Sequence, residues 1–577
     1  MEFVLDNLHF RSATECPPLT ETLTKTVDGA VSEYCLRLTF EKEVNPARYQ
    51  LIWEEPQIDA FGFWPPSSGN WPNLRPDWSM SASPSRTASG MPLACIYNKR
   101  NENRITVALS DPANPTVISA GVVEETGSLR LCVELFSQLC APMEVYEVTI
   151  RVDRRPIPFY DAVREVRSWW RTIGYQETYV PDTAKLPMYS TWYSFHQHTL
   201  PEEILAECAV AKTMGMDTVI VDDGWQTDDN SRGYAFCGDW KICGAKIPSM
   251  KDFVDRVHAL GMKFMIWFSV PFVGFESENY ERFKGMYLFS RPWSRAAILD
   301  PRFPEVRKFL VDTYCSYVKE YGWDGLKLDF IDSFYLTEDS SKDYDRMDTV
   351  SLQEAVEKLL AEATARLKAI NPEFMIEFRE SYVGPIVAKY GNIFRVTDCP
   401  NDPFVNRVDS VKLRLTAGDI AVHSDMIMWN DNETNEAVMY QLLGSLFAVP
   451  QISVRFGRIT EDHRRLLANY LSFWRDHRET LANGKIMATD VEAHYSSITA
   501  EGVGERITVL HQSIVAPVGE DTTYLFNATG KDFVHVEMEN GALCELYDLF
   551  GKKYREIALP KGISKVNLTN CGMAKIH

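Results

Sequence analysis

A lysine and an aspartate stand two residues apart in the short apolar segment GLKLDF, residues 325–330. The segment predicts a β-strand, and side chains two apart on a strand share one face, which makes Lys327 and Asp329 neighbours. A cation beside a carboxylate favours the ionised form of that carboxylate at neutral pH. Asp329, at the end of a strand, is therefore a candidate nucleophile. The alternative interpretation is a structural ion pair where the strand meets its loop.

Acidic, basic and aromatic residues also follow other short apolar segments. If those segments are neighbouring strands, at least four carboxylates, several cations and several aromatic rings meet at one edge. Such a set suits a small polyhydroxylated substrate, since a binding site combines apolar faces with a few well-placed polar groups. The residues concerned are Trp192, Tyr193, Asp222, Asp223, Trp267, Arg379, Arg395, Asp398 and Asp425.

The region from 188 to about 482 alternates between short apolar runs and amphipathic helical patterns. Eight strands alternating with helices predict a (β/α)8 TIM barrel, whose active site lies at the C-terminal ends of its strands. A doubly wound open sheet is the alternative, but no GxGxxG motif follows any predicted strand. The predicted strands are 188–192, 218–222, 263–269, 325–330, 374–378, 393–397, 420–428 and 451–456, and the predicted helices are 201–214, 250–260, 305–321, 352–370, 403–416, 435–448 and 460–479.

The flanking regions have the short alternating runs and Gly/Pro/Asn-rich turns of β domains. We expect an N-terminal β-sandwich over 1–180, the catalytic barrel over 181–485 and a small antiparallel β domain over 486–577. A helix is predicted over 160–172. The loop 61–71, rich in Pro and Trp, is too apolar for a free loop and is expected to pack on a neighbouring domain.

Composition limits the classes of partner. The chain has 577 residues and a formal net charge of -20, which argues against nucleic acid or an anionic membrane as its main partner. No apolar run approaches the ~18 residues of a membrane-spanning helix, and the N-terminus lacks the pattern of a secretion signal. The twelve cysteines include no CxxC pair, which favours free thiols in the cytoplasm. A homo-oligomer stays open.

Two carboxylates on different strands can divide the work of cleaving a glycoside, one as nucleophile and one as acid and base. Asp329, beside Lys327, suits the low-pKa role. Asp398 follows a hydrophobic run with little compensation nearby, so we expect partial burial to raise its pKa towards that of an acid. Asp402 competes for this role, but its place before Pro403 is typical of a helix cap.

Six landmarks occur in order along the predicted barrel. They are Trp192-Tyr193, Asp222-Asp223-Gly224-Trp225, Gly238-Asp239-Trp240, Trp267, Lys327-Leu328-Asp329-Phe330 and Asp398. Each motif alone is weak, yet their order at successive strand ends resembles glycoside hydrolase family 36, the retaining α-galactosidases and their relatives. The resemblance covers about residues 185 to 480, and the flanking β domains match only as architecture.

The resemblance implies a role for each matching residue. Asp329 would be the nucleophile and Asp398 the acid/base. Asp222 and Asp223 would bind the outer hydroxyls of the sugar, although a cap or loop role is the alternative. The resemblance also implies a small oligosaccharide or α-glycoside as substrate and no cofactor or metal. The other implied substrate-binding residues are Lys327 and Trp267 beside those aspartates, Trp192 and Tyr193 in the pocket wall, Arg379 and Arg395 near the 2-hydroxyl or orienting a carboxylate, and Trp64 or Trp71 from the N-terminal domain.

Two segments depart from the family pattern. Many members carry a Cys/Ser-Gly-Gly-rich segment after strand 5, where this chain has EFRESY at 377–382. Around the acid/base, many have Ser-Asp-Asn-Thr-Asp, where this chain has VTDCPND at 396–402. These segments lie near the 2-position and the leaving group. Galactose, N-acetylgalactosamine and glucose therefore all stay open as the sugar.

Three other functions were weighed. His196-x-His198 is the entry motif of metal-dependent amidohydrolases, but strands 5 and 6 end in Arg379 and Asp398, without the further histidines that such a site needs. A transglycosylase would use the same two aspartates, because the covalent step is shared. A catalytically silent sugar-binding barrel would lack one of the two acids, and both are present. Hydrolysis is therefore the favoured interpretation.

Overall fold

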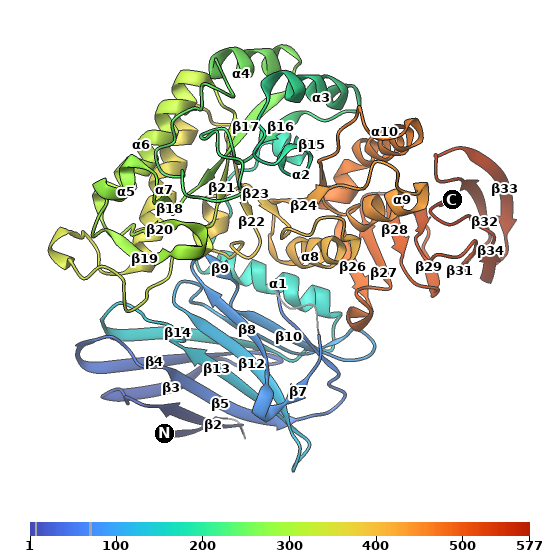
Figure 1. Ribbon diagram of the computed structural model, residues 1–577. Helices are drawn as coiled ribbons and strands as arrows, with labels where there is room; N and C mark the ends of the chain where they lie inside the picture. The colour runs from blue at the N-terminus through green and yellow to red at the C-terminus, as the bar shows by residue number, and fades with distance from the viewer. Residues whose placement is uncertain (6–7, 68–71) are drawn as a thin grey trace.

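The computed structural model describes residues 1–5, 8–67 and 72–577, and Figure 1 shows a β domain, a barrel and a second β domain in chain order. The N-terminal part has two sheets, with a buried apolar cluster between them that includes Leu36, Leu51 and Val133. Alternation along β4 and β5 places every second side chain in this core. In spatial order the first sheet is β1 (Glu2–Leu5), β2 (Leu8–Thr14), β5 (Tyr49–Pro56), β13 (Ser128–Leu135), β12 (Thr116–Val123), β8 (Ser81–Arg86) and β9 (Ser89–Gly90), with β7 (Arg75–Pro76) beside β12; the second is β3 (Thr20–Val27), β4 (Val31–Val44), β14 (Met143–Asp153), β11 (Asn103–Leu109), β10 (Leu93–Tyr97) and β6 (Gly62–Trp64).

One helix, α1 (Phe159–Thr172), joins this sandwich to the barrel. Phe159, Val163, Val166 and Trp170 recur at helical spacing and are all buried. The indole of Trp170 donates to the carbonyl of Leu109 at 2.9 Å, which ties the helix to β11. The predicted helix 160–172 is therefore confirmed, one residue longer at its start.

The barrel is closed and parallel, as predicted. The predicted strand over 188–192 ends early, because the chain turns after Ser190 into the short helix α2 (Trp192–Phe195). The last strand begins two residues earlier than predicted and ends four residues earlier. In order around the barrel the strands are β15 (Met188–Ser190), β16 (Thr218–Val221), β17 (Lys263–Ser269), β21 (Gly325–Asp329), β22 (Met375–Arg379), β23 (Ile393–Arg395), β24 (Ala421–Ile427) and β25 (Val449–Ile452).

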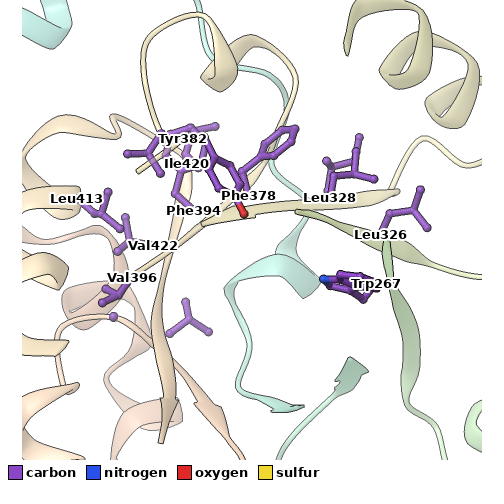
Figure 2. Packing of buried hydrophobic residues seen from close by; sticks show 14 of the residues in the cluster. Trp267, Leu326, Leu328, Phe378, Tyr382, Phe394, Val396, Leu413, Ile420 and Val422 are labelled. Carbon is purple, nitrogen blue, oxygen red and sulfur yellow. The ribbon is translucent and has the colours of Figure 1, made fainter. Parts of the chain in front are cut away.

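Helices surround the barrel, and the largest apolar cluster lies between them and the strands. Figure 2 shows part of it, with side chains from β21, β22, β23 and β24 and with Leu413 from α8. Within the described ranges, no helix is both long and apolar enough to cross a membrane. The helices are α3 (Pro201–Thr213), α4 (Met250–Ala259), α6 (Pro304–Tyr321), α7 (Leu352–Ile370), α8 (Pro403–Thr416), α9 (Asn435–Gly444) and α10 (Glu461–Asp476).

Between β17 and α6 lies a small sheet that the sequence did not predict. It pairs β18 (Phe272–Gly274), β20 (Ala296–Leu299) and β19 (Tyr287–Arg291), with the one-turn helix α5 (Glu278–Arg282) in the connection. Its strands are not separated by long amphipathic helices, and that alternation is what reveals the equally short strands of the barrel in the sequence. The sheet places Phe272 against Phe330, at the end of β21, with ring centroids 4.7 Å apart.

The C-terminal part also has two sheets around their own core. We expected an antiparallel domain, but β28–β30 and β29–β31 are parallel pairs. The reason is topological: the chain crosses from β28 to β29 in the other sheet and returns as β30 in the original direction. The first sheet is β26 (Lys485–Thr489), β27 (Ser497–Glu501), β28 (Glu505–Leu510), β30 (Thr522–Asn527), β35 (Met573–Ile576), β32 (Ala542–Tyr547) and β33 (Lys553–Leu559); the second is β29 (Val515–Val518), β31 (Val534–Met538) and β34 (Gly562–Val566).

The start of α8 tests whether Asp402 is a cap. Its Oδ1 accepts from the amides of Phe404 and Val405 at 2.9 and 3.0 Å, as the sequence predicted for an N-cap. We expect Asp402→Ala to cost about 1 kcal/mol of stability, seen in calorimetry as a thermal midpoint about 1–3 °C lower. Asp402→Asn keeps the acceptor and is the matched control. Loss of activity in the alanine variant without a change in its thermal midpoint would show that Asp402 has a role besides capping α8.

Candidate active site

The closed barrel brings the predicted polar residues together at the carboxyl ends of its strands. Lys327 and Asp329 lie on β21, Arg379 ends β22 and Arg395 ends β23. The other residues lie on or just after neighbouring strands: Trp192 and Tyr193 after β15, Asp222 and Asp223 after β16, Trp267 within β17 and Asp398 after β23.

The carboxylate of Asp329 receives donors on both oxygens. Its Oδ1 accepts from Arg379 Nε at 2.9 Å, from the Phe330 amide at 2.9 Å and from the Tyr382 hydroxyl. Its Oδ2 accepts only the indole Nε1 of Trp267 among the described residues, at 2.9 Å. Oδ2 therefore keeps a lone pair free for chemistry, while the donors on Oδ1 fix the orientation of the group.

The cation that contacts Asp329 is Arg379, and not Lys327 as the sequence suggested. Lys327 donates from Nζ to Asp222 Oδ2 at 2.5 Å, and both side chains are buried. Burial raises the pKa of Asp329, but the charge of Arg379 and then that of Lys327 outweigh burial and hold the pKa below its ordinary value. The expected ionised state is thus supported, with a different neighbour as its main cause.

Asp223 is held by two amide side chains. Gln197 Nε2 donates to its Oδ2 and Gln226 Nε2 to its Oδ1, each at 2.7 Å. Burial raises the pKa of Asp223 to about 6, more than these hydrogen bonds lower it. Gly224 lets the chain turn here, at φ +111°, since a Cβ would lie 2.5 Å from the Cα of Gln197. Asp222 and Asp223 are therefore both held in place by neighbouring side chains, and the pair does not cap a helix.

Asp398 lies at the open side of the site, with its side chain 46% exposed and its Oδ1 accepting from Arg395 Nη2 at 2.8 Å. We expected burial to raise its pKa. Burial does act in that direction, but the charges of Arg395, Arg379 and Lys327 outweigh it, and the pKa lies well below its ordinary value. The expectation was wrong for the substrate-free protein, because Arg395 turns back from the end of β23 towards this carboxylate.

Arg395 also contacts two fully buried carboxylates, those of Asp425 and Glu377. Its Nη1 donates to Asp425 Oδ1, and its Nε lies 3.5 Å from Glu377 Oε1. The other oxygen of Asp425 accepts from the Tyr193 hydroxyl at 2.9 Å. Burial raises the pKa of both Asp425 and Glu377. One guanidinium thus links Asp398 to the barrel interior, and Tyr193 is held at the rim through the same network.

Trp267 lies within a layer of aromatic rings. Its indole is buried, and the rings of Tyr234, Trp240 and Phe330 lie 6.4, 6.1 and 6.5 Å from it. The indole Nε1 of Trp225 donates to its carbonyl at 2.9 Å. These contacts fix the indole that donates to Asp329, so Trp267 positions the carboxylate.

Trp192 lies half-buried on α2, and its ring meets that of His196 at 4.6 Å. His196 Nε2 lies 3.0 Å from a guanidinium nitrogen of Arg232. In residues 1–5, 8–67 and 72–577 no three His, Cys, Asp or Glu side chains form a group that could hold a metal ion. The histidine of the H-x-H motif therefore lines the rim through ring and guanidinium contacts.

Trp64 does not join this set. Its indole is fully buried and donates at 2.9 Å to the hydroxyl of Tyr495 from the C-terminal part, which leaves no surface for a substrate. Of the segment 61–71, Trp64 contacts the C-terminal part and α1, and residues 68–71 lie outside the described residues. Trp71, the other tryptophan that we weighed, lies outside the described residues.

A different segment of the N-terminal part reaches the barrel mouth. Gly90 N donates to the carbonyl of Ser381 at 2.7 Å, and the hydroxyls of Ser89 and Ser381 lie 3.1 Å apart. Arg86 donates to the carbonyl of Asp332 at 2.7 Å. Figure 1 shows β9 at the edge of the sandwich that faces the barrel. This hairpin, residues 86–90, therefore supports the loops that follow β21 and β22.

Sequence reasoning missed several residues of the site. Tyr382 lies in the segment 377–382 that departs from the family pattern, and Gln197 lies inside the H-x-H motif. The departure was itself a signal, because a changed segment at a strand end predicts changed contacts. Nothing in the sequence indicated that Gln226 would reach Asp223.

The pair Lys327–Asp222 allows a stability test. Replacing Lys327 by Met leaves Asp222 buried without its cation, which costs about 3–5 kcal/mol. We expect a thermal midpoint several degrees lower by calorimetry. Lys251→Met is the matched control, because Lys251 and Asp255 form a pair whose side chains are 55% and 54% exposed, and such pairs contribute about 1 kcal/mol at most. Equal shifts in the two variants would contradict this interpretation.

Comparison with known proteins supports the geometry. Residues 186–355 match the Melibiase family model. The chain is 29% identical over 153 residues to α-galactosidase Mel36A of Lactobacillus acidophilus, which covers 23% of this chain and 19% of the relative. It is 30% identical over 150 residues to α-galactosidase 1 of Pediococcus pentosaceus, covering 24% and 19%. The matches thus span about a fifth of each relative.

Solved structures agree over the whole chain. A variant of the family 36 α-galactosidase AgaA of Geobacillus stearothermophilus, in complex with raffinose, superposes with a TM-score of 0.63 at 15% identity, covering 99% of this chain and 81% of that one. The α-galactosidase of Lactobacillus brevis gives 0.63 at 14% identity, covering 99% and 86%. These likenesses establish the fold, a barrel with its two β domains, and the Melibiase match supports the resemblance to glycoside hydrolase family 36 over residues 186–355.

Proposed function

We propose that this protein is a retaining, exo-acting α-galactosidase that uses Asp329 as nucleophile and Asp398 as acid and base. One observation carries the proposal: Arg379 and Lys327 lower the pKa of both carboxyls, so the two acids, on different strands, share one electrostatic environment. The charge of Asp398 in turn raises the pKa of Asp329. Double displacement needs two such carboxylates at the barrel mouth, one as nucleophile and one as acid and base.

In the first step Oδ2 of Asp329 attacks the anomeric carbon of the sugar. Oδ2 is the attacking atom because it accepts one hydrogen bond, from Trp267, while Oδ1 is fully engaged. The bond from the anomeric carbon to the leaving oxygen breaks, and Asp398 gives its proton to that oxygen. The products are a β-linked glycosyl ester of Asp329 and a free alcohol.

Asp398 must gain and lose a proton in turn. A sugar bound over its exposed side chain removes water, and loss of water raises a carboxyl pKa towards the protonated state that the first step needs. Once Asp329 is an ester its negative charge is gone, so the pKa of Asp398 falls again. Asp398 then takes a proton from water, the hydroxide attacks the anomeric carbon, and the bond to Oδ2 breaks to release the sugar with its α configuration.

The substrate follows from the polar groups around Oδ2. Asp222 and Asp223 offer acceptors for vicinal hydroxyls, and the rims of Trp192 and Tyr193 offer apolar faces. AgaA has been crystallised with raffinose and, as another variant, with stachyose. We propose oligosaccharides of this α-galactoside type as substrates here. All twelve cysteines are free, which supports a reducing compartment, the cytoplasm, as the place of action.

A panel of aryl α-glycosides tests the function. We expect turnover of the galactoside above that of the N-acetylgalactosaminide and the glucoside, with Asp329→Ala lowering kcat about 10³-fold or more. Azide should rescue Asp329→Ala with a β-galactosyl azide product and Asp398→Ala with the α product. Asp402→Asn is the matched control, because it alters a carboxyl near Asp398 but keeps the helix cap. Near-normal turnover by Asp329→Ala would overturn the assignment.

The shared cations predict a pH effect. Arg379 lowers the pKa of both carboxyls, so Arg379→Gln should raise both. Protonation of Asp329 in the free enzyme sets the acidic limb of kcat/KM, and ionisation of Asp398 in the substrate complex sets the basic limb of kcat, so both limbs should move to higher pH. Arg379→Lys keeps the charge and should stay nearer to the wild-type profile. A shift to lower pH in the glutamine variant would contradict the arrangement.

A further inference from the structure

A second cavity, of about 470 Å³, lies where α1, the C-terminal end of α8 and the start of the C-terminal β domain meet. Figure 1 shows α1 beside α8 and β26 in this region. It is far from the catalytic end, because α8 starts next to the Asp398 segment and runs about 20 Å before it reaches this cavity. Five basic residues line it: Arg164, Arg167, Arg171, Arg414 and Lys485.

Carboxylates balance only part of this charge. Glu177 accepts from Arg167 and Arg171. Asp161 accepts from Arg164 at 2.6 Å and from Lys485 at 3.1 Å, and Asp419 lies 2.9 Å from a nitrogen of Arg171. Five cations against these three carboxylates leave an excess of two positive charges in the cavity wall.

Arg414 is the cation without a carboxylate partner among the described residues. It donates only to backbone carbonyls, those of Phe447, Leu481 and Gly484. Burial, followed by the charge of Arg164, lowers the pKa of Arg414 to about 9. An anion in the cavity would relieve both effects.

Arg167 supplies a second, independent sign of a ligand. The residue is 3% exposed, and its Nη2 nitrogen has no hydrogen-bond partner in the part of the chain that the structure describes. A buried donor without a partner costs about 1–3 kcal/mol, so such groups are rare unless a ligand or water meets them. Arg167 is among the residues that line the cavity.

We propose that this cavity binds a phosphate monoester. A dianion matches the excess of two positive charges, and planar guanidinium groups donate in pairs to phosphate oxygens. The volume of 470 Å³ lies in the range of small-molecule sites and leaves room for an organic group beside the phosphate. The bound ester would hold α1 of the sandwich linker, α8 of the barrel and the start of the C-terminal domain together. The proposal does not depend on the activity of the barrel.

The experiment is calorimetry of the full chain with inorganic phosphate, with a hexose 6-phosphate and with chloride at equal ionic strength. We expect the thermal midpoint to rise with both phosphates and to rise further with the ester. Arg164→Gln and Lys485→Gln, two partly exposed residues whose loss should not prevent folding, should weaken phosphate binding at least tenfold in a titration. Arg167→Gln should do the same if it folds.

Arg256→Gln is the matched control. Arg256 is a partly exposed arginine of α4 that pairs with Glu202, so the variant loses the same charge outside the cavity. We expect it to bind phosphate as the wild type does. No rise of the wild-type midpoint with either phosphate would overturn the proposal, and so would equal binding by the Arg164 and Arg256 variants. A thermal midpoint that rises with inorganic phosphate but rises no further with the ester would overturn the assignment to a phosphate monoester. It would indicate a site for free phosphate.

Discussion

The charge of Asp329 is the interaction on which the rest of the site depends. An ionised carboxylate that is 6% exposed would cost several kcal/mol if it were left alone. Hydrogen bonds from Arg379 on β22, Trp267 on β17 and Tyr382 in the loop after β22 offset that cost. The parallel pairing of β17, β21 and β22 brings these segments to the same edge of the barrel. The aromatic layer around Trp267 and the hairpin below the loop of Tyr382 can both be understood as support for these donors.

Charge sharing is the second organising feature. Lys327 forms an ion pair with Asp222, and Arg379 forms one with Asp329. Arg395 forms ion pairs with three carboxylates at once. The charges of Arg379 and Lys327 therefore lower the pKa of both proposed catalytic carboxyls. A change in charge at Asp329 is felt at Asp398, which is what a residue that alternates between acid and base requires.

The sequence was sufficient for the barrel, because long amphipathic helices such as 352–370 and apolar runs such as 263–269 carry strong periodicity. It also located Asp329 and Asp398, since residues at strand ends share one edge of a barrel. It could not tell which cation contacts Asp329, because that depends on side-chain direction across neighbouring strands. The low pKa of Asp398 was missed for a similar reason: Arg395, three residues earlier, folds back onto it. The small sheet of β18, β19 and β20 was missed because no long helices separate its strands, and the parallel pairs of the last domain left no readable pattern.

The hairpin 86–90 joins the first domain to the segment that carries Tyr382. Gly90 bonds Ser381 directly, and a Cβ at Gly384 would lie 2.8 Å from the carbonyl of Gly90, so the two backbones are in close contact. Most surface turns tolerate insertions because nothing depends on their length. This turn is an exception: one residue more or less would displace the support of Tyr382. The length of this turn in the sandwich is therefore tied to the geometry around Asp329.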